Sequence, residues 1–164
     1  MNTPQIKQEK GFTIIEVVLV LAIAGLIFLM VFVALPSLQR GQRDAQRKQD
    51  LARISTQLTN YVSSTRGAVP DDRQSLGAFV KNYLDGKDNS TKVAGDEYKD
   101  PSGENYVVDY EGTPNNQGEI RYFYKSKCKD DGSGTTDKTT ASRDFALIMK
   151  LENQKAPYCV DNRS

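Results

Sequence analysis

The stretch GFTIIEVVLVLAIAGLIFLMVFVAL, residues 11–35, decides the fold of this chain. From Val17 to Leu35 it carries no charged side chain, and as an α-helix this part rises about 28 Å. That length is close to the ~30 Å hydrocarbon core of a bilayer. The stretch therefore predicts one helix that spans a membrane or packs among other apolar helices.

The rest of the chain is hydrophilic and has room for about one domain. The 164 residues have a mean hydropathy of −0.57, and 22 basic against 21 acidic residues leave a formal charge of +1. A charge so near zero gives no overall field that would favour nucleic acid. The chain has no histidine, no recognisable nucleophile setting and no phosphate-binding glycine loop. We therefore expect no enzyme, cofactor or metal site.

The junction between Gly11 and Phe12 is a candidate processing site because it precedes the apolar run. A secretory signal has a shorter apolar region, and its small-x-small cleavage site follows that region. Cutting after Gly11 would instead leave the apolar helix on the mature protein. The alternative is a single-pass anchor that is not processed.

Glu16 is the only charged residue between Gly11 and Leu35. A carboxylate at the start of a membrane segment is costly unless it has a partner, so it indicates a function. Cleavage after Gly11 would create a free amine on Phe12, four residues away and on the same helix face. That amine could pair with Glu16 of its own chain or of a neighbouring one. The alternative is an interfacial glutamate that the helix dipole tolerates.

Residues Lys10 to Leu35, and above all Gly11-Phe12-Thr13-Ile14-Ile15-Glu16, resemble the type IV pilin family, including its pseudopilins. The resemblance implies that residues 1–11 are a leader, that a prepilin peptidase cuts after Gly11, and that Phe12 is N-methylated. It further implies that Glu16 guides the subunit onto a helical filament of identical or related subunits, which an assembly platform and ATPases build.

Small residues in the apolar helix fit the same resemblance. Gly25 is in register with a glycine that is common in the family, and Ala22 adds small surface nearby, so both are candidate helix-packing residues. Pro36 departs from the pattern, because many pilins place a proline about one turn earlier. We expect Pro36 to bend the helix at the end of residues 12–36.

The sequence contains conflicting signals about the orientation of the helix across the membrane. The leader carries Lys7 and Lys10 against Glu9, whereas the far flank is richer in basic residues: Arg40, Arg43, Arg47, Lys48 and Arg53. The positive-inside rule alone would place that flank in the cytoplasm. The resemblance favours the opposite orientation, in which the helix crosses the cytoplasmic membrane once with the N-terminus in the cytoplasm and the rest of the chain outside. A disulfide between Cys128 and Cys159, if formed, favours it as well.

Residues 37–66 are expected to continue the helix in amphipathic form. An apolar stripe at three-to-four spacing would pack on the rest of the domain: Leu51, Ile54, Leu58, Tyr61 and Val62. The opposite, solvated face would hold four basic residues of the far flank: Arg43, Arg47, Lys48 and Arg53. Alternatively they could bind lipid head groups, DNA or acidic faces of neighbouring subunits. Gly67 and Pro70 are expected to end the helix.

Residues 67–164 are expected to form an α+β domain, in which a small antiparallel sheet packs against the long helix. A helix is predicted from Asp71-Asp72 to about Leu84, with Gly86 as its stop. Strands are predicted over 106–111, 120–127, 145–151 and 158–160, with a surface loop over 129–142.

Cys128 and Cys159 lie outside any Cys-x-x-Cys spacing, so a disulfide is favoured over a zinc or redox site. Such a bond would place this part of the chain in an oxidising compartment. Asp130, Asp131 and Asp137 crowd one loop, but their spacing does not match an EF-hand, and a solvated loop is favoured over a calcium site. Asn89 begins a glycosylation triplet of low specificity.

The leading functional hypothesis is a structural subunit of a type IV pilus that serves adhesion, surface motility or DNA uptake. The second is a pseudopilin of a type II secretion or competence machine. A single-pass anchored binding protein is more remote. DNA and host surfaces as ligands have no support in the sequence.

Overall fold

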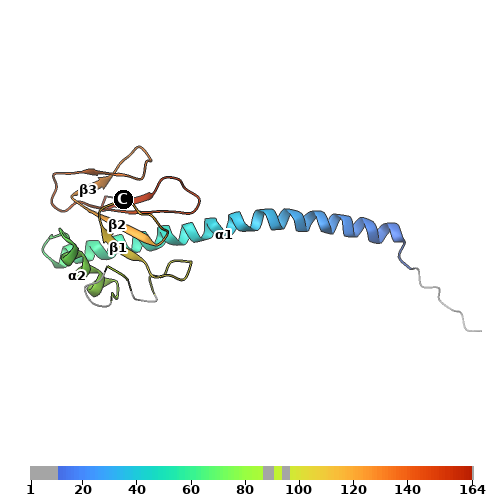
Figure 1. The fold of residues 1–164 in the computed structure, drawn as a ribbon, viewed down its shortest axis with the longest axis horizontal. Helices are drawn as coiled ribbons and strands as arrows, with labels where there is room; N and C mark the ends of the chain where they lie inside the picture. Colours follow the sequence, from blue (N-terminus) through green and yellow to red (C-terminus); the bar gives the residue numbers. More distant parts are fainter. Residues whose placement is uncertain (1–10, 87–90, 94–96, 164) are drawn as a thin grey trace, which may run out of the picture. The chain divides into compact units, whose positions relative to one another are not determined.

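The computed structural model describes residues 11–86, 91–93 and 97–163. Most of the expected leader, including Lys7, Glu9 and Lys10, lies outside these ranges, as do Asn89 and Ser90 of the glycosylation triplet. The chain divides into two compact units, unit 1 (residues 1–39) and unit 2 (residues 40–164). Figure 1 shows the helices and strands along the chain.

The first element is α1, Ile14–Ser64, a helix of 51 residues that contributes to both units. Among the described residues it is the one helix long and apolar enough to cross a membrane. Pro36 lies inside α1 and does not end it, and the expected bend there stays a prediction. The amide of Gly67, with a φ of 91°, donates to the Val62 carbonyl at 2.7 Å just beyond the helix end.

Unit 2 holds a four-stranded sheet in the order β1-β2-β5-β6. The strands are β1 Val107–Tyr110, β2 Glu119–Tyr124, β5 Phe145–Met149 and β6 Tyr158–Asp161. The pairs β2–β5 and β5–β6 are antiparallel, with Tyr122 opposite Leu147 and Leu147 opposite Val160. This long helix and small sheet confirm the expected α+β class.

The first strand pair departs from the antiparallel arrangement that the sequence predicted. β1 runs parallel to β2, with Val107 opposite Glu119, so the sheet is mixed. Residues 111–118 carry the chain back along β1, and positive φ angles of 49° at Glu111 and 84° at Gly118 turn it at both ends of this loop. Parallel strands need such a return, because a tight hairpin can join only antiparallel ones.

A second sheet pairs β3, Ser126–Cys128, with β4, Thr136–Lys138, in antiparallel register. The prediction of one strand over 120–127 is wrong, because Lys125 adopts a φ of 48° between β2 and β3. β4 also lies where a surface loop was predicted. A lone residue in the left-handed region leaves no periodicity in the sequence, which is why the break was missed.

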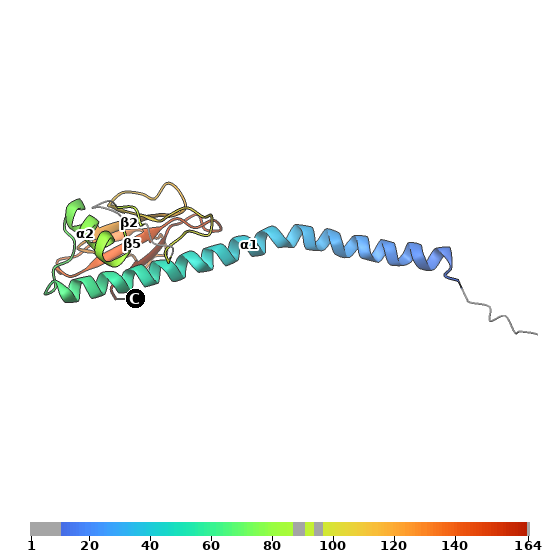
Figure 2. The same cartoon turned by 90° about the horizontal axis from the view of Figure 1, so that it is seen from below.

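The core of unit 2 lies between its part of α1, the sheet and α2, Arg73–Tyr83. Figure 2 shows β2 and β5 alongside the part of α1 that belongs to unit 2. The predicted stripe is confirmed, since Leu51, Ile54 and Leu58 are fully buried and Tyr61 and Val62 pack against the same core. Asp72 caps α2 by accepting a hydrogen bond of 2.7 Å from the Ser75 amide.

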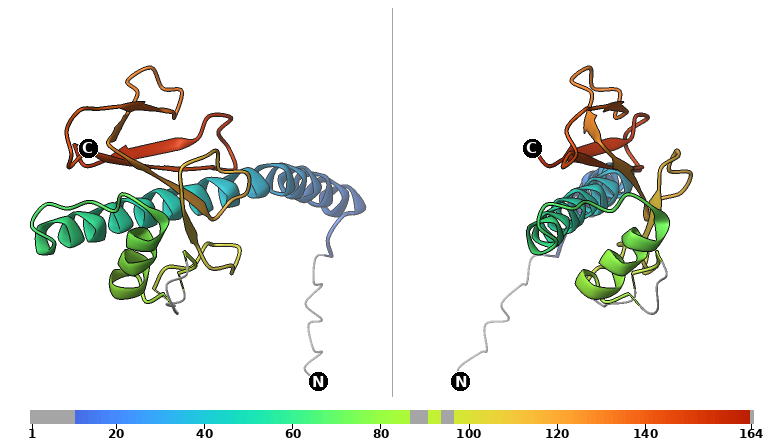
Figure 3. Two further views of the ribbon diagram at one scale, coloured as in Figure 1. Left: turned by 60° about the vertical axis from the view of Figure 1, so that its left-hand side comes forward. Right: turned by 90° about the vertical axis from the view of Figure 1, so that its left-hand side faces the viewer.

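Helix α2 and strand β3 lie toward opposite edges of the four-stranded sheet. α2 contacts β1, whereas β3 contacts β5 and β6, as the two views of Figure 3 illustrate. The expected disulfide joins Cys128 of β3 to Cys159 of β6, with a Cα–Cα distance of 5.9 Å and a sequence separation of 31 residues. Closing a loop of that length stabilises the fold by about 3–4 kcal/mol on the chain-entropy model.

The turn between β3 and β4 approaches a distant loop very closely at Gly134. A Cβ at this position would lie 1.7 Å from the carbonyl oxygen of Pro157, and Gly134 has a φ of 64°. Gly132, with a φ of 72°, has open space where its Cβ would be. The two glycines therefore share a left-handed backbone but differ in their surroundings.

We expect Gly134→Ala to destabilise unit 2 more than Gly132→Ala. Both variants incur the cost of a left-handed alanine, about 1–2 kcal/mol, but only Gly134→Ala also forces the β3–β4 turn away from Pro157. Urea unfolding of the full chain in detergent, followed by circular dichroism, measures the difference. Equal losses of stability in the two variants would contradict this packing.

Candidate functional site

The first turn of α1 satisfies the carboxylate of Glu16 from within the chain. Glu16 Oε2 accepts hydrogen bonds from the Thr13 amide at 2.9 Å and from the Thr13 hydroxyl at 2.7 Å. The Thr13 hydroxyl in turn accepts from the Glu16 amide at 3.4 Å. This is a capping box, in which a threonine and a glutamate three residues later satisfy amides that have no partner inside the helix.

Sequence reasoning named Glu16 but assigned its partner to Phe12 alone. The pattern Thr13-x-x-Glu16 just before an apolar run was the available signal for this cap. Only Oε2 is used, and among the described residues Oε1 has no hydrogen-bond partner. Gly11 and Phe12 precede the helix, and Phe12 is 89% exposed, so the candidate cleavage point is accessible in this structure.

Within the described residues, the apolar part of α1 is uncovered. Phe12 and the large apolar side chains of α1 from Ile14 to Leu38 are between 45% and 89% exposed. An apolar surface of this extent marks a site of contact with a membrane or with other proteins. The helix thus fits a membrane-anchored chain, as length and composition predicted.

Ala22 and Gly25 lie three residues apart on this exposed helix and so share a face. Nothing lies within 4 Å of the position where Gly25 would carry a Cβ. The described fold therefore does not itself require a glycine here. A residue without a side chain at this point lets another helix approach closely.

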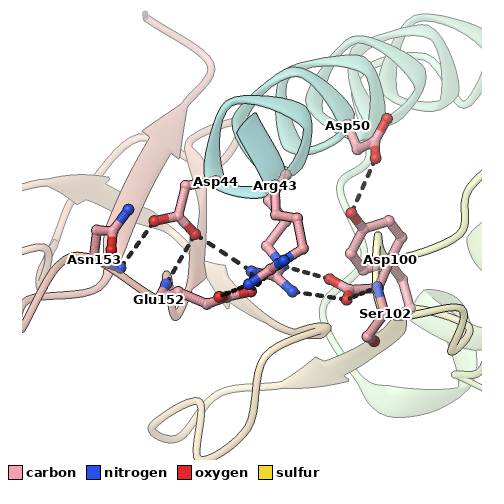
Figure 4. A network of polar contacts seen from close by, with 9 residues as sticks. Arg43, Asp44, Asp50, Asp100, Ser102, Glu152 and Asn153 are labelled. Carbon is pink, nitrogen blue, oxygen red and sulfur yellow. Dashed lines mark hydrogen bonds and ion pairs between the residues drawn. The ribbon is translucent and has the colours of Figure 1, made fainter. Parts of the chain in front are cut away.

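The sequence predicted that the basic stretch after the apolar segment forms a solvated face, and for Arg47 this prediction is wrong. Arg47 is 1% exposed, and its guanidinium donates to Asp100 at 2.5 and 2.8 Å, to Glu152 at 2.7 Å and to Asp44 at 3.3 Å. Arg43 makes two further hydrogen bonds to Glu152, at 2.8 and 2.6 Å. Figure 4 shows how these side chains from three segments converge.

Asp44 extends this buried network to the backbone of the loop after β5. Its two carboxylate oxygens accept from the amides of Glu152 at 2.8 Å and Asn153 at 2.9 Å. Six residues later in α1, Asp50 accepts a hydrogen bond of 2.9 Å from the Tyr106 hydroxyl. The start of α1 within unit 2 is therefore held to two distant loops by charged groups.

The electrostatics of the network favour its charged form. Hydrogen bonds from Arg43 lower the pKa of Glu152 to about 2, despite an opposing effect of burial. Burial raises the pKa of Asp100, but hydrogen bonds from Arg47 and Ser102 outweigh it and leave that pKa below its usual value. Asp50 differs, because burial raises its pKa more than Tyr106 and Arg53 lower it.

The remaining basic residues of this stretch also have partners inside unit 2. Arg53 pairs with Glu97 and lies 3.6 Å from Asp50, and the Lys48 ammonium lies 5.0 Å from the centre of the Tyr158 ring. Of the five basic residues in the positive-inside count, Arg40 is the one for which the described residues contain no ion pair or ring partner. The interpretation of this stretch as a surface for DNA or neighbouring subunits is wrong for the buried Arg47.

Two of the aspartates considered for a calcium site, Asp131 in the β3–β4 loop and Asp137 in β4, interact with groups of the protein. Asp131 accepts from the Ser133 amide at 2.9 Å, and Asp137 lies 3.5 Å from the Lys129 ammonium. Within the described ranges, no three acidic, cysteine or histidine side chains come together as metal ligands would.

Comparison with known proteins identifies one feature of the chain. Residues 6–32 match the family model described as the prokaryotic N-terminal methylation motif. This match covers the junction at Gly11, the capping box and most of the exposed apolar helix. No curated protein and no solved structure shows significant similarity to the chain.

We expect Arg47→Met to destabilise unit 2 by about 3–5 kcal/mol, because it leaves the buried Asp100 carboxylate without its cation. Arg53→Met removes the same charge from a side chain that is 40% exposed, and should cost at most about 1 kcal/mol. Chemical unfolding of the full chain in detergent compares the two variants. Similar losses would show that the Arg47 contacts contribute little.

Because of this network, the free energy of unfolding of unit 2 should fall in acid. The pKa of Glu152 is about 2 in the fold against a usual value of 4.5, so its contribution is complete above pH 4.5 and disappears as the pH falls toward 2. Asp100 acts in the same direction, whereas the raised pKa of Asp50 opposes it. Unfolding free energies measured between these pH values should fall, and Glu152→Gln should flatten the decline. An unchanged slope in that variant would contradict this assignment.

Proposed function

We propose that this protein, whose residues 6–32 carry the type IV pilin and pseudopilin signal, is a structural subunit of a type IV pilus. In this proposal a prepilin peptidase removes residues 1–11 and N-methylates Phe12. The mature chain then polymerises with identical or related subunits, driven by an assembly platform and ATPases, into an extracellular filament. The filament serves adhesion, surface motility or DNA uptake.

One observation carries the proposal: the apolar helix is exposed along its length, and the predicted processing site at Gly11 lies just before it. Because the signal precedes the helix, processing leaves the apolar surface on the mature subunit. Lipid covers this surface while the subunit is stored in the membrane. Neighbouring helices would cover it once the subunit enters a filament.

Glu16 supports the step from membrane to filament. Thr13 satisfies one of its carboxylate oxygens in the uncut chain, while the other has no partner among the described residues. Cleavage creates the Phe12 amine, and a neighbour's amine can then bind the free oxygen. A charge pair of this kind is strong where water is excluded.

The small residues of the apolar helix support the same packing. The fold itself does not need Gly25, since its missing side chain leaves open space. With Ala22 on the same face, it offers a neighbouring helix a close approach.

The disulfide between Cys128 and Cys159 supports a location of unit 2 outside the cytoplasm, where such bonds persist. We therefore propose that the N-terminus lies in the cytoplasm before assembly. The basic residues that argued against this orientation are mostly paired within unit 2, as Arg43 and Arg47 illustrate. These residues stabilise the fold of unit 2, and this role does not depend on the orientation of the chain in the membrane.

Mass spectrometry of the N-terminus tests the proposal. Protein sheared from the cell surface as fibres should begin with N-methylated Phe12. Glu16→Val should still be membrane-bound but enter the sheared fraction at least about tenfold less, because it lacks the charge pair. Val17→Ile in the same turn serves as the control and should assemble normally.

The outcomes separate the alternatives. Assembled material that retains Met1, or a Glu16→Val variant that assembles as well as the control, would overturn the proposal and leave a simple anchor. The same signal occurs in pseudopilins, which are the second candidate. Correct processing without fibres, together with lost protein secretion in a deletion strain, would identify that function.

A further inference from the structure

We propose that a groove between α1 and the unpaired side of β6 binds an extended peptide segment of another protein, which adds to the four-stranded sheet as an outer strand. The groove, here named the β6 groove, has a volume of about 370 Å³. Its walls include Ala52, Ser55 and Thr59 of α1, and Tyr158, Val160 and Asn162 at β6. Groove and sheet both belong to unit 2, so the inference does not depend on membrane anchoring or filament assembly.

One side of β6 has no partner strand. β5 pairs with the other side, with Val160 opposite Leu147, and no further strand of the described ranges pairs with β6. In an antiparallel pair, every second residue of an edge strand points its N–H and C=O groups away from its neighbour. Val160 and Asp161 point their side chains to opposite faces of the sheet, yet both line the β6 groove. The groove therefore runs along the unpaired backbone of the strand.

The hydroxyl of Ser55 marks the β6 groove as a binding site. Ser55 lines the groove and is only 7% exposed, but in the part of the chain that the structure describes its hydroxyl has no hydrogen-bond partner. The hydroxyl of Thr59, one turn later, instead donates to the Ser55 carbonyl at 3.0 Å. A buried polar group without a partner lowers stability, and a ligand that bonds to it removes this cost.

The charged groups beside the β6 groove already have partners. Among the described residues that line it, Asp161 alone is charged, and its carboxylate accepts from two backbone amides, at 2.9 and 3.0 Å. The Lys48 ammonium lies 5.0 Å from the centre of the Tyr158 ring, and Arg163 donates to Asp144 at 2.6 Å. A charged ligand would lose its hydration here without gaining a free counter-charge, so a neutral segment fits best.

A peptide strand is the neutral ligand that these groups fit. Its N–H and C=O groups repeat every two residues, in step with those on the unpaired side of β6, and form main-chain hydrogen bonds there. The residues of β6, Tyr158–Asp161, would pair with a segment of similar length, about 13 Å. Side chains that face α1 would meet Ala52 and the Ser55 hydroxyl, which favours small or hydroxyl-bearing residues.

A folded second copy of unit 2 offers no free strand within the described ranges. Its β1 is bridged to Lys92 on the outer side, and its β3 contacts β5 and β6. Its β4 faces residues 111–113, with the Lys138 ammonium 2.6 Å from Glu111. Its own β6 has α1 along the unpaired side, so two such edges would bring their helices into collision. The segment therefore comes from another protein, in a part that is not folded into a sheet.

Nuclear magnetic resonance spectroscopy of the full chain in detergent tests the proposal. The probe is a pool of N-acetylated pentapeptide amides with alanine, serine, threonine or valine at each position, added to about 1 mM. We expect saturable shifts of the amide signals of residues 158–162. A second pool with methylated backbone nitrogens lacks the strand donors and should bind at least about tenfold more weakly.

Two substitutions in the groove and one outside it test the location. Ala52→Phe places a large ring in the groove from an exposed position and should weaken binding by about tenfold or more. Ser55→Ala removes the hydroxyl and should weaken binding about fivefold. Ala45→Phe makes the first change at an exposed position two turns earlier in α1, outside the groove, and should leave binding as it is.

The proposal is wrong if residues 158–162 do not shift, if the methylated pool binds equally well, or if Ala45→Phe and Ala52→Phe lose binding alike. Signals of β6 that shift with protein concentration in the absence of peptide would identify a second copy as the occupant, and this result would equally contradict it. Because Ser55→Ala is a small change, it keeps the location testable where Ala52→Phe disturbs the fold.

Discussion

The guanidinium of Arg47 is almost fully buried, and the arrangement of unit 2 around α1 depends on how its charge is met. Asp100 and Glu152 approach it from two loops, while Asp44, one turn earlier, holds the second of these loops by its backbone. A buried charge is tolerated only with such partners, because its removal from water is costly. The network therefore constrains three segments at once.

The two units deal with apolar surface in opposite ways. In unit 1 the large apolar side chains are exposed, whereas in unit 2 the stripe of Leu51, Ile54 and Leu58 is fully buried. One helix thus carries a surface that needs lipid or neighbouring chains and a surface that needs only its own domain. Both surfaces fit the proposed function, in which the subunit is first stored in a membrane and later polymerised.

The local features of the chain were predictable from the sequence. The apolar segment, the stripe of α1 and the cap of α2 each depend on residues within a few turns of one another. The disulfide was predicted because only Cys128 and Cys159 were available. The cap that Thr13 provides for Glu16 was also readable from the spacing, although Phe12 was considered instead.

By itself, the sequence determined where the apolar helix begins and which residues α1 buries, and it predicts a processing site at Gly11 within the matched motif. These follow from composition and periodicity along a single segment. Only the tertiary structure decided that Arg47 is buried rather than solvated, and that β1 runs parallel to β2. The physical reason for the first is that the partners of Arg47 lie 53 and 105 residues away in the chain. For the second, the direction of β2 depends on the path of the loop that precedes it. Such long-range pairings leave no mark in local spacing.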